Sequence, residues 1–471
     1  MSEEKHLAGN ALGTFESAVM GIAGTAPAFS VAVTTATIVD AVGVLSVGSI
    51  FYCGFIMFGT MLAFIHLSKI MPNAGAAYAW VGHVFGKTWG FFAGWGLLVA
   101  SIVFMVSATM PAAQSTLELI TELKWISPER VDNTTWVAVT SAIWLTLVTI
   151  VVTRGIKHAS YTQILLTGLE TIVVFALIIG AFVHFGRQPV HAPSWAWFSP
   201  ASFTPRTFAS GALSAIFFYW GWDVTMNLTE ESKGGRQNSA SRGAFLAVVN
   251  LILFYCIIMI VVLIALSDKE IADAKTKVLY VMATKLFPAP WNYLAVIATL
   301  LSTIGTIETQ LLQFSRSMFA MARDDMLHPR YSTIHSRWQT PWVATCAIWL
   351  LGVLLLFGSS YMPSVKAILK CSIDAIGFQI CFYMSLTGFA CAWHYRNKLT
   401  TGLYNAVSYV LWPLFSALFM VFIAVYSVPT FGEDRTTNII TNVVGIGGLV
   451  IGFGPLLLGG AWRRAKLARA S

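Results

Sequence analysis

The sequence predicts an all-α, polytopic membrane protein that crosses the bilayer about twelve times. Of its 471 residues, 56% are hydrophobic and only 11% are charged, whereas soluble domains carry about 25% charged residues. The apolar residues also gather in runs of about 20, the length that crosses a hydrocarbon core about 30 Å thick. This composition excludes a soluble enzyme, a disordered chain and a nucleic-acid-binding protein.

Twelve apolar runs follow one another along the chain, and each predicts a membrane span. They lie near residues 12–38, 45–67, 88–113, 134–153, 160–184, 207–230, 243–266, 291–320, 342–359, 367–394, 405–428 and 438–461. We expect a single membrane-embedded domain over residues 1–471, with a first repeat at 12–184, a second, inverted repeat at 207–394 and two last helices at 405–461.

The distribution of Lys and Arg orients these spans. An even number of spans puts both termini on one side, and 18 of the 29 basic residues then fall on that side. Because loops rich in Lys and Arg stay in the cytoplasm, we expect both termini to be cytoplasmic, in a multi-pass protein of the inner (cytoplasmic) membrane. The net charge of +8 thus reflects topology. The six cysteines are scattered without metal-ligand spacing, so we expect no metal and no cofactor.

Two spans contain residues that interrupt a helix. The first contains Gly21, Gly24 and Pro27, and the sixth contains Gly221 followed by Asp223. Each alone is compatible with a packing glycine or an ordinary proline kink. However, they open two consecutive sets of five spans, and paired breaks of this kind indicate an inverted-repeat transporter with a substrate site between the breaks. The sequence therefore predicts a 5+5 inverted repeat with broken helices 1 and 6.

Four segments of the chain are similar to a known family: the break at 21–27, and the stretches at 72–78, 221–231 and 316–325. In these segments the chain resembles the amino acid–polyamine–organocation (APC) permeases, which have the leucine-transporter-like fold. The resemblance implies a secondary transporter for an amine or amino acid, driven by protons or by exchange. It also implies that the first break holds the substrate carboxylate and the sixth break its ammonium group.

The first break departs from the family pattern in a way that concerns the substrate. Amino acid carriers of the family usually have Gly-Ser/Thr-Gly there, whereas this chain has Gly24, Thr25 and Ala26 followed by Pro27. The Cβ of Ala26 and the missing N–H of Pro27 weaken the carboxylate cradle. The pattern is closer to that of the family's putrescine importers. On span 5, Glu170 aligns with a position where many relatives carry a lysine.

We expect the substrate contacts at the two breaks. The candidate residues are Gly21, Ala23, Gly24, Thr25, Phe217, Tyr219, Trp220, Gly221, Trp222 and Asp223. Aromatic faces attract ammonium groups, so the four aromatics beside Asp223 form a candidate amine cage. By the resemblance, Phe217 also serves as the gate that closes over the substrate. Asp223 has a second interpretation, as a cap on the N–H groups of the helix that follows the break.

Acids within apolar spans are candidates for function, because a charge at the bilayer centre costs at least about 2.5–3.5 kcal/mol. Glu170 and Glu308 lie well inside spans 5 and 8, with no basic residue in the hydrophobic core beside them. Either is a candidate carrier of a coupled proton, and the alternative is a neutral carboxylic acid that is hydrogen-bonded to backbone. Asp374, at the start of span 10, is a candidate gate at the outer entrance.

Together these features predict a secondary active transporter, not an enzyme, that takes up a cationic amine, polyamine or amino acid together with protons. Two alternatives of the same family stay open: a permease for zwitterionic amino acids, and an exchanger that needs no proton. The expected partners are the small-molecule substrate, protons and the lipid bilayer, with no nucleic acid. Both a monomer and a homodimer fit the sequence.

Overall fold

A computed structural model describes residues 7–234, 239–361, 364–428 and 435–459. These residues form helices and no β-strand, apart from an isolated bridge between Leu12 and Ser232. Within them, ten helical stretches are long and apolar enough to cross a membrane. The first stretch, Thr14–Ser68, holds two of the predicted spans, and the broken sixth span is too short to be counted. The predicted all-α, polytopic fold is confirmed.

The two broken spans are formed by α1 (Thr14–Thr25) with α2 (Pro27–Val42), and by α8 (Pro205–Tyr219) with α9 (Val224–Asn227). The remaining helices are α3 (Ser46–Ser68), α4 (Ala77–Phe85), α5 (Lys87–Glu122), α6 (Thr134–Thr153), α7 (Ile156–Phe185), α10 (Ser239–Ala265), α11 (Asp268–Ala274), α12 (Val278–Leu286), α13 (Leu294–Arg323), α14 (Trp342–Ser359), α15 (Val365–His394), α16 (Leu403–Ala406), α17 (Trp412–Ser427), α18 (Arg435–Asn442) and α19 (Gly448–Ile451).

The first break lies at Ala26. Helix α1 ends at Thr25, Ala26 takes a left-handed conformation with φ at 47°, and Pro27 begins α2. Proline suits the first position of a helix, because its fixed φ is helical and its missing N–H has no partner to lose there. A left-handed residue followed by proline therefore ends one helix and starts the next in the middle of the span.

The second break lies at Trp220 and Gly221. Helix α8 ends at Tyr219, Trp220 is extended, and Gly221 has a φ of 116°. Residues with a side chain rarely take this conformation, whereas glycine takes it at little cost. The four-residue helix α9 then continues the span.

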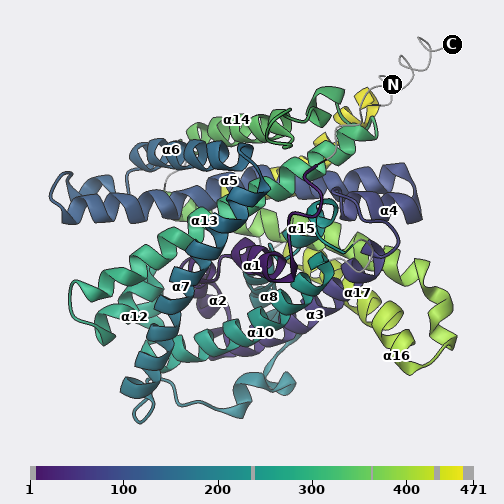
Figure 1. Cartoon of the computed structure of the whole chain (residues 1–471). Helices are drawn as coiled ribbons and strands as arrows, with labels where there is room; N and C mark the ends of the chain where they lie inside the picture. Colours follow the sequence, from purple (N-terminus) through teal and green to yellow (C-terminus); the bar gives the residue numbers. More distant parts are fainter. Residues whose placement is uncertain (1–6, 235–238, 362–363, 429–434, 460–471) are drawn as a thin grey trace, which may run out of the picture.

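The two breaks face each other in the middle of the bundle, where Figure 1 shows α1 beside α8. A Cβ placed on Gly24 would come within 2.2 Å of the Gly221 carbonyl oxygen, and a Cβ on Gly221 within 2.1 Å of the Gly24 oxygen. Neither position has room for a side chain. The predicted pair of opposed breaks is confirmed, and glycine at both positions is what allows the two backbones to touch.

A short helical connection covers one end of the bundle, at α11 and α12. Lys285 forms an ion pair with Glu270, with Nζ 2.7 Å from Oε1, and the side chain of Glu270 also accepts a hydrogen bond from the Ser267 N–H. The ammonium group of Lys285 is the main cause that lowers the pKa of Glu270 to about 2, and the Ser267 N–H adds to the effect. Carboxylates ordinarily titrate near 4.3 when unfolded.

This pair predicts a pH-dependent stability of α11. Because the folded pKa is below the unfolded one, the stabilisation is complete above about pH 4.3 and is lost as the pH falls towards 2. Partly exposed pairs contribute about 0.2–1 kcal/mol, so hydrogen exchange in residues 268–274 should rise up to about fivefold from pH 5 to pH 2.5, after correction for intrinsic rates. Glu270→Gln should show little of this rise. An equal pH effect in both proteins would contradict the assignment.

Candidate functional site

Helix α13 joins the two breaks through polar side chains. Thr306 Oγ1 and Gln310 Nε2 donate to the Gly24 carbonyl oxygen, at 2.8 and 3.2 Å. Gln313 Nε2 donates to Asp223 Oδ2 at 2.8 Å. Because residues three apart share a helix face, Gln310 and Gln313 present their amides to neighbouring parts of the same site. The candidate site is therefore formed by α1, α8, α9 and α13.

Asp223 is fully enclosed at the second break. Its Oδ2 accepts hydrogen bonds from Gln313 and, at 2.8 Å, from the hydroxyl of Tyr383 on α15. The Tyr383 oxygen in turn accepts the Trp220 indole N–H at 2.8 Å. The side chain makes no capping hydrogen bond to α9, so the expected helix cap is wrong. Asp223 instead ties α9 to α13 and α15.

Three buried oxygen atoms of this site have no hydrogen-bond partner among the described residues: Asp223 Oδ1, Gln310 Oε1 and Gln313 Oε1. The side-chain amides of Gln310 and Gln313 both lie next to oxygen acceptors, so their NH2 groups must point toward these acceptors. Their amide oxygens are then left without a hydrogen-bond donor. Buried polar groups in folded proteins are nearly always paired. Three orphaned acceptors around one break are therefore suited to a ligand that donates hydrogen bonds.

The aromatic residues of the second break point in different directions. Trp220 packs edge-on against Phe104 at 5.1 Å, and Phe217 lies 6.5 Å from Trp220. Tyr219 donates its hydroxyl hydrogen to a carbonyl of α3, and the Trp222 ring packs against α3 as well. The four rings do not enclose one common space, so the expected four-ring cage is wrong. Of the four candidate rings, Phe217 and Trp220 are the pair that lie beside each other.

The residues of the first break have separate roles. Gly21 lies against Ala247 of α10, where a Cβ would approach to 2.9 Å, and is a packing position. Ala23 accepts the Ala26 N–H at 3.1 Å, and the Thr25 hydroxyl donates to Ile22 at 2.8 Å. Hydrogen bonds within the break thus satisfy several of its backbone groups.

The two embedded glutamates lie between α7 and α13. Glu170 Oε1 accepts the Ala28 N–H at 2.7 Å and the Ser302 hydroxyl at 2.8 Å. Glu308 Oε2 accepts from Gln163 Nε2 at 2.6 Å, and its Oε1 is buried without a partner. No Lys or Arg contacts either carboxyl group among the described residues. Glu170 therefore belongs to the first break, whereas Glu308 faces α7.

A cavity of about 420 Å³ lies on the side of the breaks toward which α2 runs. Charged residues of both signs line it, among them Asp40, Asp273 and Lys275. Its floor includes Val33, one turn of α2 beyond Phe29, and Phe29 packs against Phe104 at 6.4 Å. The ring contacts from Phe29 through Phe104 to Trp220 therefore run from this side of α2 to the second break. Asp374 follows Ile373, which lines the cavity.

Ion pairs close the opposite end of the site, which lies away from the cavity. Arg316 and Glu231 form a fully buried, two-pronged pair with N–O distances of 2.9 and 3.0 Å. Arg323 and Glu230 form a second pair, at 2.9 Å, that is partly exposed. The segment before α1 joins this closure, because the N–H groups of Ala11 and Leu12 donate to the Glu231 carbonyl. The site is thus closed by ion pairs at this end and lies behind aromatic rings at the end that faces the cavity.

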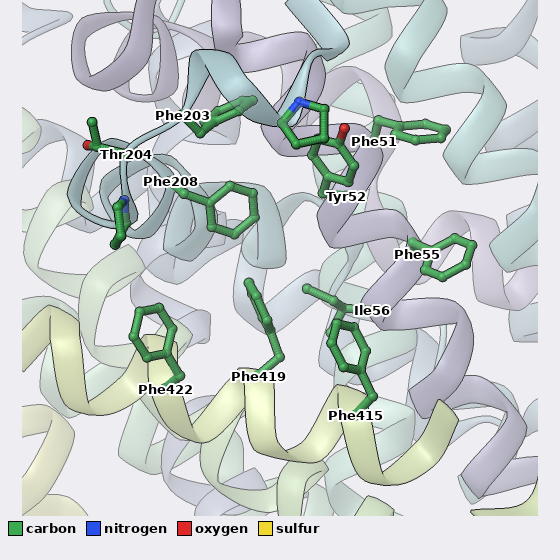
Figure 2. Close-up of a pocket in the computed structure, with 12 residues that line it drawn as sticks. Phe51, Tyr52, Phe55, Ile56, Phe203, Thr204, Phe208, Phe415, Phe419 and Phe422 are labelled. Atoms are coloured by element: carbon green, nitrogen blue, oxygen red, sulfur yellow. The ribbon is translucent and has the colours of Figure 1, made fainter. Parts of the chain in front are cut away.

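A separate groove of about 590 Å³ lies between α3, the start of α8 and α17. Figure 2 shows it bordered by aromatic rings, including Phe55, Phe208 and Phe419. No charged residue lines it, and several of its rings are exposed on the apolar surface. Because its lining is apolar, the groove is chemically unsuited to a charged substrate. The described residues also contain no cluster that could hold a metal ion.

The sequence interpretation missed Gln310, Gln313 and Tyr383. Two amides three residues apart in a membrane span were the available signal, because such groups are costly in a membrane unless they have partners. Their importance depends on the register of α13 against the breaks, which local sequence does not define. Tyr383 gave no comparable signal among the 14 tyrosines.

Comparison with known proteins agrees with this architecture. The sequence profile of the amino acid permease family matches residues 12–449. The chain is 26% identical over 308 residues to the human Asc-type amino acid transporter 1, covering 64% of this chain and 56% of the relative. It is 24% identical over 287 residues to the serine/threonine exchanger SteT of Bacillus subtilis, covering 60% and 61%.

A third relative is the branched-chain amino acid permease BcaP of Lactococcus lactis, at 23% identity over 317 residues, 64% of this chain and 65% of the relative. The matches span about three fifths of the length of these relatives. The family match extends over nearly the whole described chain and includes both breaks. The chain therefore belongs to the amino acid permease family of the APC superfamily, a family of membrane transporters rather than enzymes.

Proposed function

We propose that this protein is a permease of the cytoplasmic membrane that takes up a cationic amine, polyamine or amino acid together with protons. The observation that carries the proposal is the set of three unpaired acceptors, Asp223 Oδ1, Gln310 Oε1 and Gln313 Oε1. An alkylammonium group has three N–H donors and no acceptor. Its positive charge also complements the buried carboxylate of Asp223 where water does not screen the interaction.

The closures on either side of the breaks support alternating access. In this proposal the substrate enters from the outer cavity, passes the layer of Phe29, Phe104 and Trp220, and binds between the breaks. Phe217, which lies on α8 one turn before the second break, closes over the substrate, and Asp374 lies near the entrance. Opening of the inner ion pairs then releases the substrate to the cytoplasm, as one repeat rocks against the other.

Uptake into proteoliposomes tests the proposal. Radiolabelled 1,4-diaminobutane should accumulate when the outside is acidic, and purified protein should gain thermal stability with amines by mass action. If 1,4-diaminobutane accumulates to the same level whatever the pH gradient and in the presence of an uncoupler, transport is not coupled to protons.

Glu308 is the better candidate for the coupled proton. Its Oε1 has no partner and can take a proton without breaking the bond from Gln163 to Oε2. We expect Glu308→Gln to lose pH-driven accumulation about tenfold or more and to keep exchange of labelled for unlabelled substrate, because general proton transfer needs a titratable group. Wild-type, pH-driven accumulation by the variant would exclude Glu308 as the proton carrier.

A second candidate function is the exchange of zwitterionic amino acids without protons. The name of the relative SteT, a serine/threonine exchanger, favours this candidate. If L-serine and L-threonine compete for uptake and their decarboxylated analogues do not, this second function replaces the first.

A further inference from the structure

Every backbone N–H group at the start of α2 has a hydrogen-bond partner. In a broken helix, the N-terminal end of the second half attracts anions, because its first N–H groups are free and the helix dipole is positive there. Here Ala26 N–H bonds to Ala23, Pro27 has no N–H, and Phe29 N–H donates to the Ser302 hydroxyl at 3.2 Å. The remaining amide, that of Ala28, donates to Glu170 at 2.7 Å.

Glu170 reaches this position from another helix. It lies on α7, is 3% exposed, and comes 142 residues after Ala28 in the chain. The Ser302 hydroxyl donates to the same Oε1 atom at 2.8 Å while accepting from Phe29. One carboxyl group and one hydroxyl group thus use every donor that the first turn of α2 offers. An incoming carboxylate would have to displace them and would lie beside another acid.

We propose that Glu170 is a built-in carboxyl group that fills the anion-binding position of the first break, so that the site selects amines without an α-carboxylate. The inference rests on the proposed function and narrows its substrate class. Glu170 acts through the amides of α2 and is a specificity-determining residue that need not touch the substrate. The unpaired acceptors at the second break complement this selection, because they recognise the ammonium group alone.

A merely structural helix cap would behave differently. Loss of a cap lowers stability but leaves the relative affinities of two ligands unchanged. Loss of a residue that occupies an anion site frees donors and changes the selectivity toward carboxylates. The ratio of two affinities therefore separates the two roles even when the variant is less stable.

The experiment uses ligand pairs that differ only in an α-carboxylate: 1,4-diaminobutane with ornithine, and isobutylamine with valine. Affinities are measured by thermal shift on the purified full-length protein and by competition in proteoliposomes. Wild type should bind one or both amines and neither amino acid. In Glu170→Ala, the affinity for the matching amino acid should rise at least about tenfold, whereas the affinity for the amine should change less than about threefold.

Two variants complete the design. Glu308→Gln removes an embedded carboxyl group that does not contact α2, and it should not gain amino acid binding. Ser302→Ala frees the Phe29 amide without removing Glu170, so we expect a smaller gain in amino acid affinity. If Glu170→Ala does not fold, Ser302→Ala is used to test the inference in its place.

Each outcome is decisive. Wild type that binds ornithine or valine as tightly as the matching amine overturns the inference and leaves a permease function standing. If wild type binds amines but Glu170→Ala gains no amino acid binding, Glu170 is only a helix cap. The same conclusion follows from Ser302→Ala if Glu170→Ala does not fold. Failure of wild type to bind any amine, with amino acids bound instead, overturns both the inference and the preferred substrate class. No binding of either class overturns the proposed function itself.

Discussion

Replacing Asp223 with Asn is expected to reduce the uptake of a cationic substrate about 10- to 150-fold. Hydrogen bonds to charged groups contribute about 1.5–3 kcal/mol, and this carboxylate is buried with one oxygen free. Asn keeps an oxygen that accepts from Gln313 and Tyr383, so the fold should persist. Uptake of labelled 1,4-diaminobutane in proteoliposomes, with thermal unfolding as a check of the fold, measures the effect.

The matched control is Tyr383→Phe. This change removes the hydroxyl that donates to Asp223 Oδ2 and accepts the Trp220 indole N–H, and it leaves the carboxylate and Gln313 in place. Tyr383 occupies Oδ2, whereas the ammonium group would bind the unpaired Oδ1, so uptake should fall less than in Asp223→Asn. If Asp223→Asn transports as well as wild type, or no worse than Tyr383→Phe, the carboxylate does not bind the ammonium group.

The positions of the breaks were predictable because local backbone chemistry produces them. Proline at residue 27 and glycine at 221 act on their own φ angles, and no distant contact is needed. A packing glycine was only the alternative interpretation of each break, and the sequence did not predict that Gly24 and Gly221 would contact each other.

The chemistry of the site was less predictable because it depends on contacts between distant parts of the chain. Glu170 was recognisable as an embedded acid, but its partner lies 142 residues away. The position of Asp223 suggested a helix cap. Instead, its carboxylate accepts hydrogen bonds from Gln313 and Tyr383, which lie 90 and 160 residues away in the chain. The helical boundaries show the same limit. Helix α5 continues to Glu122, beyond the apolar run, because good helix formers follow it.

The ion pairs Arg316–Glu231 and Arg323–Glu230 differ in burial, and this difference predicts which of them opens during transport. Replacing Arg316 with Met leaves Glu231 charged and enclosed, so we expect a loss of about 3–5 kcal/mol in the free energy of unfolding. Both side chains of this pair are 0% exposed. Denaturant titration of the purified protein in detergent measures the loss. In the double variant Glu231→Leu/Arg316→Met most of it should be recovered, because no charge is then left unpaired.

The matched control, Arg323→Met, should cost only about 0–1 kcal/mol, because Arg323 and Glu230 are 38% and 22% exposed and the pair is screened by water. Its effect should instead be on the conformational equilibrium. Glu230 also accepts the Ala74 N–H at 2.9 Å and so fastens the segment before α4 to the end of α13. We therefore expect Arg323→Met to favour the inward-open state, with faster labelling of a cysteine placed at Thr229. If Arg316→Met increases labelling and Arg323→Met does not, the buried pair is the gate.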